Sequence, residues 1–140
     1  MKIIIYGEPV AQGRPRFTMR NGYPQAIDPA NSREYKEKVK LYAIHAMKQE
    51  SYTTPEGAIL VDIVFHMSIP QSWPKKKRTE AAQGLIRPTS KPDIDNLFKC
   101  LTDALKGLAW KDDSQITDVH MKERYTDTMP RTEITITEVK

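Results

Sequence analysis

Two carboxylates, Asp93 and Asp95, stand close to Lys99 in the segment Lys91-Pro92-Asp93-Ile94-Asp95-Asn96-Leu97-Phe98-Lys99. A second acidic pair, Asp112-Asp113, follows further along the chain. If three or four of these carboxylates converge, their charges repel one another unless a proton or a divalent cation bridges them. Hard oxygen ligands of this kind suit Mg²⁺ or Mn²⁺. The pattern therefore indicates a divalent-cation site with the carboxylates as its ligands.

A purely structural role fits the same spacing. Asp93 stands where the N-cap of a helix belongs, and Asp95 and Lys99 have the i, i+4 spacing of an ion pair across one helical turn. Such a pair contributes only about 0.3–0.5 kcal/mol to the stability of a helix. The spacing alone leaves the structural and the cation-binding interpretations both open.

A helix over residues 93–106 is expected to position these side chains. Its apolar residues recur every three or four positions, and Gly107 is a suitable end. Asp93 and Asp95 fall in the first turn, where the helix dipole favours anions. Asp95 and Lys99 belong to a separate polar face. The apolar stripe consists of Ile94, Leu97, Phe98, Leu101, Leu105 and Leu108.

The reach of the chain limits how the second acidic pair can join the first. A helix over residues 93–106 is about 20 Å long, at about 1.5 Å per residue. The stretch from Gly107 to Asp113 spans at most about 23–25 Å when it is fully extended. Either this stretch runs almost straight back along the helix, or a second subunit supplies the partner carboxylate.

The other segments predict an α+β fold in a single domain over residues 1–140. Residues 59–69 alternate cleanly between apolar and other residues, which is the strongest strand signal in the chain. Leu60 and Val64 on the second face of this strand indicate a central position in the sheet. We expect a single-layer mixed β-sheet with helices packed on it. Further strands are predicted over residues 2–6, 116–124 and 131–139, and a further helix over residues 74–83.

The long segment from residue 7 to residue 29 is rich in proline and glycine and reads as a loop. A hairpin is expected at Asn21-Gly22, because this dipeptide favours a tight turn between two strands. Asn31 or Ser32 can cap the helix that follows, which runs to about residue 49.

The charge is divided unevenly along the chain. Lys and Arg number 22 against 18 Asp and Glu, so the net charge is only +4. Residues 1–91 hold 15 basic and 8 acidic residues, whereas residues 92–140 hold 7 and 10. A basic portion beside an acidic cluster indicates a polyanion held against a cation site.

Two basic segments are the expected contacts to that polyanion. Arg14 and Arg16 lie in the long loop, and a basic tetrad follows Trp73-Pro74 in the connector. A solvated helix face would also explain the tetrad, but the basic surface continues through Arg87 toward the acidic segment. The candidate phosphate contacts are Arg14, Arg16, Lys75, Lys76, Lys77, Arg78 and Lys91.

Composition excludes several classes of protein. The hydrophobic share of 39% supports one modest core and excludes a disordered chain. The lone Cys100 cannot form an intrachain disulfide, so packing and a reducing cytoplasm are expected. Apolar runs fall far short of the roughly 20 residues that cross a bilayer, so no membrane association is expected. Trp110 is expected to plug the core, and the scattered His45, His66 and His120 are expected to be structural or solvated.

Three elements of the sequence together resemble the RusA family of Holliday junction resolvases. They are the segment from Lys91 to Lys99 with Asp103-Ala104-Leu105-Lys106-Gly107, the segment Asp112-Asp113-Ser114-Gln115-Ile116, and the opening Gly7-Glu8-Pro9-Val10 with Arg14-Pro15-Arg16. The resemblance spans most of the chain. The spaced acidic elements are fairly specific together, whereas either alone would be weak.

The resemblance implies a small homodimeric endonuclease that cuts four-way DNA junctions using Mg²⁺, with Mn²⁺ as a possible substitute. It implies catalytic and metal-binding roles for Asp93, Asp95 and Asp113 and a catalytic role for Lys99. Asp112 lies beside the last carboxylate at a position where the family pattern is more tolerant. The family is often prophage-encoded, so a bacterial or phage-encoded cytoplasmic protein is expected. The candidate phosphate contacts named above are inferred from the charge of these residues and not from the family resemblance.

Metal ions held by carboxylates can activate a water and stabilise charge on the phosphoryl and leaving oxygens. Lys99 could contact the scissile phosphate or orient the water. Phe17 could enter a branched junction or anchor its own loop. Three alternatives stay open: a nuclease with a broader preference for branched or flap DNA, a non-catalytic DNA-binding module, and a structural protein that binds divalent cations.

Overall fold

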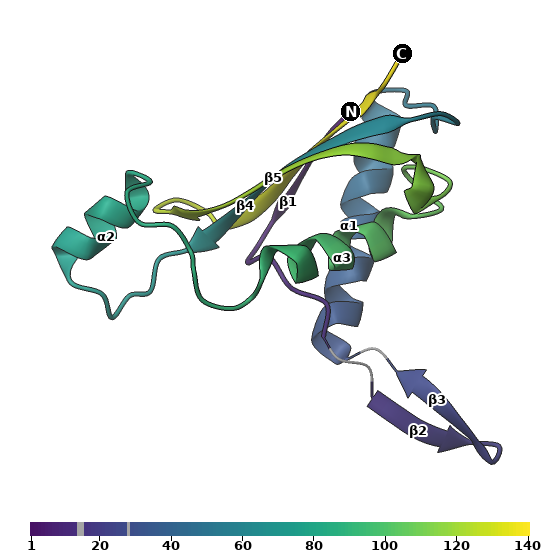
Figure 1. Ribbon diagram of the computed structural model, residues 1–140, viewed down its shortest axis with the longest axis horizontal. Helices are drawn as coiled ribbons and strands as arrows, with labels where there is room; N and C mark the ends of the chain where they lie inside the picture. The colour runs from purple at the N-terminus through teal and green to yellow at the C-terminus, as the bar shows by residue number, and fades with distance from the viewer. Residues whose placement is uncertain (14–15, 28) are drawn as a thin grey trace.

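The computed structural model describes the chain at every position except 14, 15 and 28 (Figure 1). Each helix and strand expected from the sequence is present, with ends within two residues of the expected ones. The elements are β1 (Lys2–Tyr6), β2 (Arg16–Arg20), β3 (Tyr23–Ile27), α1 (Ala30–Gln49), β4 (Ile59–Ser68), α2 (Lys75–Ala82), α3 (Ile94–Leu105), the 3₁₀ turn η1 (Asp113–Gln115), β5 (Ile116–Thr126) and β6 (Arg131–Glu138).

The main sheet is mixed and has the strand order β1-β6-β4-β5. β6 runs antiparallel to both β1 and β4, whereas β4 and β5 are parallel. A parallel pair needs a crossover connection, and the segment that carries α2 and α3 provides it. The central position expected for the strand over residues 59–69 is confirmed, because β4 lies between β6 and β5.

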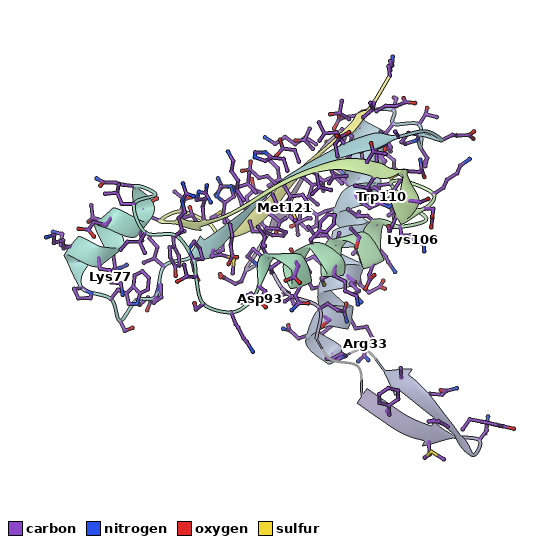
Figure 2. All side chains as sticks on the ribbon, viewed as in Figure 1. Arg33, Lys77, Asp93, Lys106, Trp110 and Met121 are labelled. Atoms are coloured by element: carbon purple, nitrogen blue, oxygen red, sulfur yellow. The ribbon has the colours of Figure 1, made fainter. Side chains whose placement is uncertain are left out.

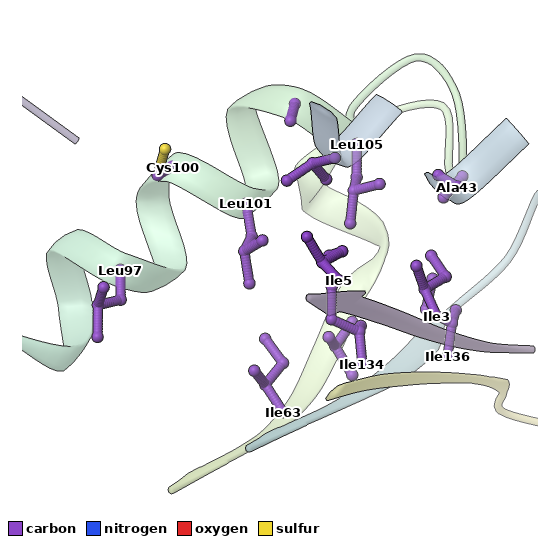
Figure 3. Packing of buried hydrophobic residues seen from close by; sticks show 14 of the residues in the cluster. Ile3, Ile5, Ala43, Ile63, Leu97, Cys100, Leu101, Leu105, Ile134 and Ile136 are labelled. Carbon is purple, nitrogen blue, oxygen red and sulfur yellow. The ribbon is translucent and has the colours of Figure 1, made fainter. Parts of the chain in front are cut away.

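Helices α1 and α3 lie side by side on one face of this sheet (Figure 1). Leu101 and Leu105 of α3 are buried there and face isoleucines of the strands (Figure 3). On the sheet side, alternate residues of β4 from Ile59 to Met67 are buried, as a half-covered strand requires. The apolar stripe predicted for α3 therefore fixes how the helix lies on the sheet, which leaves its polar face and first turn at the surface. The fold is α+β, as expected.

Two elements project from this body on different sides (Figure 1). One is the separate hairpin of β2 and β3, whose turn residues Asn21 and Gly22 both have positive φ angles, 53° and 79°. These angles are those of the type I′ turn that suits a two-residue hairpin loop, so the hairpin predicted there is confirmed. The other projection is α2, which carries the basic tetrad.

The cap predicted for α1 at Asn31 or Ser32 is wrong. The N-cap position is two residues before Asn31, at Pro29, and the helix begins at Ala30. Ser32 lies inside the helix and is buried, and its hydroxyl accepts a hydrogen bond of 2.9 Å from the Gly13 backbone N–H. Ser32 therefore anchors the preceding loop instead of capping the helix.

None of the helices in the described part of the chain is long and apolar enough to span a membrane.

Candidate functional site

The first turn of α3 presents two carboxylates at the surface. Asp93 occupies the N-cap position, but its side chain makes no capping hydrogen bond to the described chain. Asp95 follows in the first turn and is exposed, and among the described residues it forms no ion pair with Lys99. Asp93 is therefore the N-cap residue, as expected, but neither a capping hydrogen bond of its side chain nor an Asp95–Lys99 ion pair is present among the described residues. Both carboxylates remain available to a ligand.

Asp93 lies between two hollows of the surface. One cavity, of about 540 Å³, is lined by Asp93, Asp95 and Glu123 together with residues of the connector before α3. The second, of about 620 Å³, is lined by Asp93 and Lys91 together with residues 11–13, which lead to the hairpin. The predicted residues Asp93, Asp95 and Lys91 are thus gathered at one place, at the edge of the sheet near β5.

Glu123 is an acidic residue of this place that the sequence analysis missed. It lies on β5 between Met121 and Tyr125 on the strand face that packs toward the core. Its Oε2 atom is buried and has no hydrogen-bond partner among the described residues. Burial raises the pKa of Glu123, and the charge of Asp93 raises it further. A carboxylate on the covered face of an alternating strand was the signal in the sequence that could have revealed it.

Asp113 lies at the opposite end of α3 from Asp93. The indole Nε1 of the buried Trp110 donates a hydrogen bond of 2.8 Å to Asp113 Oδ1. Trp110 itself forms a bridge with Lys106, the residue directly after α3 (Figure 2). A helix of this length separates its two ends by about 18 Å. Asp113 is therefore held beside the C-terminal end of the helix, away from the first turn.

The stretch from residue 107 to residue 113 does not run straight back along α3. Its start is folded onto the helix end, because the Ala109 N–H donates to the Leu105 carbonyl at 2.9 Å and the Gly107 N–H to the Trp110 carbonyl at 2.7 Å. In the described residues no three His, Cys, Asp or Glu side chains gather closely enough to hold a metal ion. Of the two routes expected for convergence, the extended return within one chain is wrong.

Asp112 has a local structural role. Its carboxylate accepts hydrogen bonds from the Ser114 hydroxyl and backbone N–H, and Lys106 Nζ lies 3.3 Å away. These bonds lower the pKa of Asp112, the Ser114 hydroxyl having the largest effect. With Gln115 it forms a capping box around η1. Asp112 therefore has a structural role that needs no part in the proposed catalytic site.

The basic tetrad is split between two faces of α2. Lys75 and Arg78 line a cavity of about 600 Å³ between α2 and the turn that joins β5 to β6. Lys77 points elsewhere, with its Nζ 3.9 Å from the centre of the Trp73 ring, and Lys76 lines the same small hollow as Lys77 (Figure 2). The two faces follow from the rotation of about 100° per residue in a helix.

Several other predicted residues have simple placements. Lys99 is exposed one turn beyond Asp95, and Arg16 begins β2, whereas Arg14 lies outside the described residues. The structural or solvated character expected of the histidines is confirmed, because His66 bonds Glu133 at 2.6 Å, His120 lies 3.6 Å from Asp62 and His45 is exposed. Trp110 and Cys100 are buried in the core, as expected.

A small α+β fold with exposed carboxylates between two projections, one of them basic, suits a protein that acts on a polyanion. Comparison with known proteins agrees and is more specific. The sequence model of the Endodeoxyribonuclease RusA family matches residues 6–137. A protein of Bacillus subtilis (strain 168), "Uncharacterized protein YqaN", is 43% identical over 141 residues, which cover 99% of this chain and 96% of that protein.

The chain belongs to the RusA family of endodeoxyribonucleases. It is therefore a nuclease, a hydrolase that acts on DNA. The family resolves Holliday junctions, and its members are divalent-metal-dependent nucleases in general.

Proposed function

We propose that this chain is a homodimeric, Mg²⁺-dependent resolvase that cuts four-way DNA junctions by paired phosphodiester hydrolysis in recombination and repair. The observation that carries the proposal is the pair of exposed carboxylates at the start of α3, Asp93 and Asp95, for which the described part of the chain provides no hydrogen-bond or ion-pair partner. A two-fold dimer suits the reaction, because symmetric cleavage needs two equivalent sites on opposing strands.

The carboxylates at the start of α3 would supply part of a divalent-cation site, since no three acidic or histidine side chains of the described chain lie close enough to form one by themselves. Carboxylate oxygens are the ligands that Mg²⁺ prefers, and the buried Oε2 of Glu123 has no partner in the described chain although Asp93 is near. Asp93 and Asp95 would hold the metal, with Glu123 beside them in the same subunit. When bound, the metal supplies an activated water and stabilises charge on the phosphoryl group.

Two further side chains complete the proposed site. Lys99 places a positive charge one turn beyond Asp95, where it can neutralise charge on the scissile phosphate or orient the water. Asp113 is proposed to come from a second subunit, because its own subunit holds it at the other end of α3. Its hydrogen bond from Trp110 would fix the carboxylate in one orientation for that role.

The basic residues are proposed to hold the arms of the junction by their phosphates. Lys75, Lys76, Lys77 and Arg78 present charge on both faces of α2, and Lys91 lies beside Asp93. Arg14 and Arg16 would extend the contact on the side of the hairpin. These side chains neutralise phosphates without reading the base sequence.

The direct test is cleavage of a synthetic four-way junction beside a linear duplex of the same sequence, each with and without Mg²⁺. We expect paired nicks on opposing strands of the junction, only with Mg²⁺, and no cutting of the duplex. Equal cutting of flaps, three-way branches and four-way junctions would instead indicate a broader branched-DNA nuclease. Binding without any cutting would indicate a non-catalytic module.

Replacing Lys75 and Arg78 together with glutamine is expected to weaken junction binding and its dependence on salt. The slope of log affinity against log salt concentration should become shallower by about 0.9 for each phosphate that the variant no longer neutralises. Fluorescence anisotropy at several salt concentrations measures this slope. Lys48→Gln, at the end of α1, is the matched control, and an unchanged slope in the double variant would contradict the proposed role of α2.

Glu123→Gln is expected to raise the melting temperature of the metal-free protein and to reduce the further rise that Mg²⁺ or Mn²⁺ produces. The amide removes a partly buried charge near Asp93, but it is a poorer metal ligand than a carboxylate. Thermal unfolding in EDTA and in either metal measures both effects, with the exposed Glu138→Gln as control. A metal-induced shift equal to that of the wild type would exclude Glu123 from the metal site.

A further inference from the structure

The hairpin of β2 and β3 has one apolar face. Residues that are directly paired in an antiparallel ladder point to the same side, and the register pairs Phe17 with Ala26 and Met19 with Pro24. These residues are two apart on each strand, so all four share one face. The face therefore carries an aromatic ring and a thioether with no polar side chain among them.

This apolar face is open to solvent. Phe17 is 75% exposed and Met19 is 70% exposed, and Pro24 and Ala26 are exposed as well. Figure 1 shows the hairpin standing clear of the sheet and of the three helices. A lone two-stranded hairpin is at best marginally stable in water. Covering this face with a partner would remove apolar area from water and stabilise the hairpin.

Residues 11–13, which precede the hairpin, are anchored beside the proposed catalytic carboxylates. The Gln12 backbone N–H donates a 3.0 Å hydrogen bond to the Asn96 carbonyl in the first turn of α3. Gly13 passes so close to the start of α1 that a Cβ atom there would lie 2.7 Å from the Pro29 ring. Residues 11–13 also line the cavity that contains Asp93. A DNA strand bound by the hairpin would therefore lie near the first turn of α3.

The charge of the hairpin segment suits a polyanion. Residues 9–27 contain three arginines and no aspartate or glutamate. An aromatic ring on which a base stacks, with cations in the same segment that meet phosphates, is a combination by which proteins hold nucleotides that are not fully stacked.

We propose that the β2–β3 hairpin is a DNA arm, whose apolar face stacks on the base pairs that lose a stacking neighbour at the branch point of the junction. This proposal rests on the proposed function, because it explains why the same enzyme would prefer branched DNA to linear DNA. Phe17 supplies the stacking surface, and Met19 extends it. The interior of a linear duplex exposes no such base-pair face, so the arm acts on the junction alone.

The test compares junction and duplex binding by the full chain in EDTA, where no cleavage occurs. Phe17→Ala is expected to weaken four-way junction binding on the order of tenfold and to leave duplex binding almost unchanged. Phe17→Tyr should bind the junction like the wild type, whereas Phe17→Leu should lose most of the preference, because it keeps apolar volume without an aromatic ring. Leu41→Ala on α1, which removes a side chain of similar exposure, 69%, is the matched control.

Two results would overturn the arm. One is junction binding by Phe17→Ala equal to that of the wild type. The other is normal junction binding by Phe17→Leu together with a change from dimer to monomer in Phe17→Ala, measured by sedimentation, which would show that a second copy covers the face. Circular dichroism verifies that each variant is folded. If the wild type fails to cut junctions with Mg²⁺, the proposed function fails, whereas normal cutting with unchanged Phe17→Ala binding rejects the arm alone.

Discussion

Asp95→Asn is expected to abolish junction cleavage while leaving junction binding intact. The amide has nearly the same size as the carboxylate, so the first turn of α3 keeps its shape, but it is a much weaker ligand for a hard cation. Metal stabilisation of the transition state contributes several kcal/mol, so the loss in rate should be at least about 100-fold. Cleavage of a labelled four-way junction with Mg²⁺ measures the rate, and anisotropy in EDTA measures the affinity.

Asp103→Asn is the matched control for this variant. Asp103 lies on the same helix, but its carboxylate faces Lys36 at 3.5 Å and has no place in the proposed site. We expect this variant to cut junctions nearly as fast as the wild type. If Asp95→Asn also cuts at the wild-type rate with Mg²⁺ present, the metal-site proposal is wrong.

The sequence predicted the helix that carries these carboxylates because its apolar stripe is continuous. Leu101 and Leu105 must be buried against the sheet, which fixes the rotation of the helix about its axis. The polar residues of the opposite face are then exposed to solvent. The hairpin turn was predictable for an equally local reason, since Asn21 and Gly22 tolerate positive φ angles. Where short-range chemistry decides the conformation, the predictions agree with the structure.

The parts that the sequence did not predict depend on contacts between distant segments. Ser32 has the chemistry of a cap, but the hydrogen bond to Gly13, nineteen positions away, gives it another role. Glu123 was missed because its importance lies in its nearness to Asp93 across two elements of the fold. Residues 107–113 are long enough to bring Asp113 back along α3 when fully extended. In the structure they instead begin with a compact turn at the C-terminal end of the helix.

A mixture of Asp95→Asn and Asp113→Asn subunits is expected to regain cleavage that neither variant has alone. If Asp113 is supplied by the second subunit, one site of each mixed dimer contains both asparagines and the other site contains both native aspartates. The intact site should then nick one strand of the junction, while paired cleavage stays absent. Co-expression with two different affinity tags isolates the mixed dimer, and a junction labelled on each strand in turn reports the nicks.

The matched control for this experiment is a mixed dimer of Asp95→Asn and Asp93→Asn. Both residues belong to the first turn of α3, so each subunit spoils its own site whichever subunit supplies Asp113. This dimer should be inactive. If the dimer of Asp95→Asn with Asp113→Asn is inactive as well, although it forms and binds junctions, Asp113 is not shared between subunits. A single nick from that dimer alone would place Asp113 in the partner's site, because no arrangement within one chain leaves either site intact.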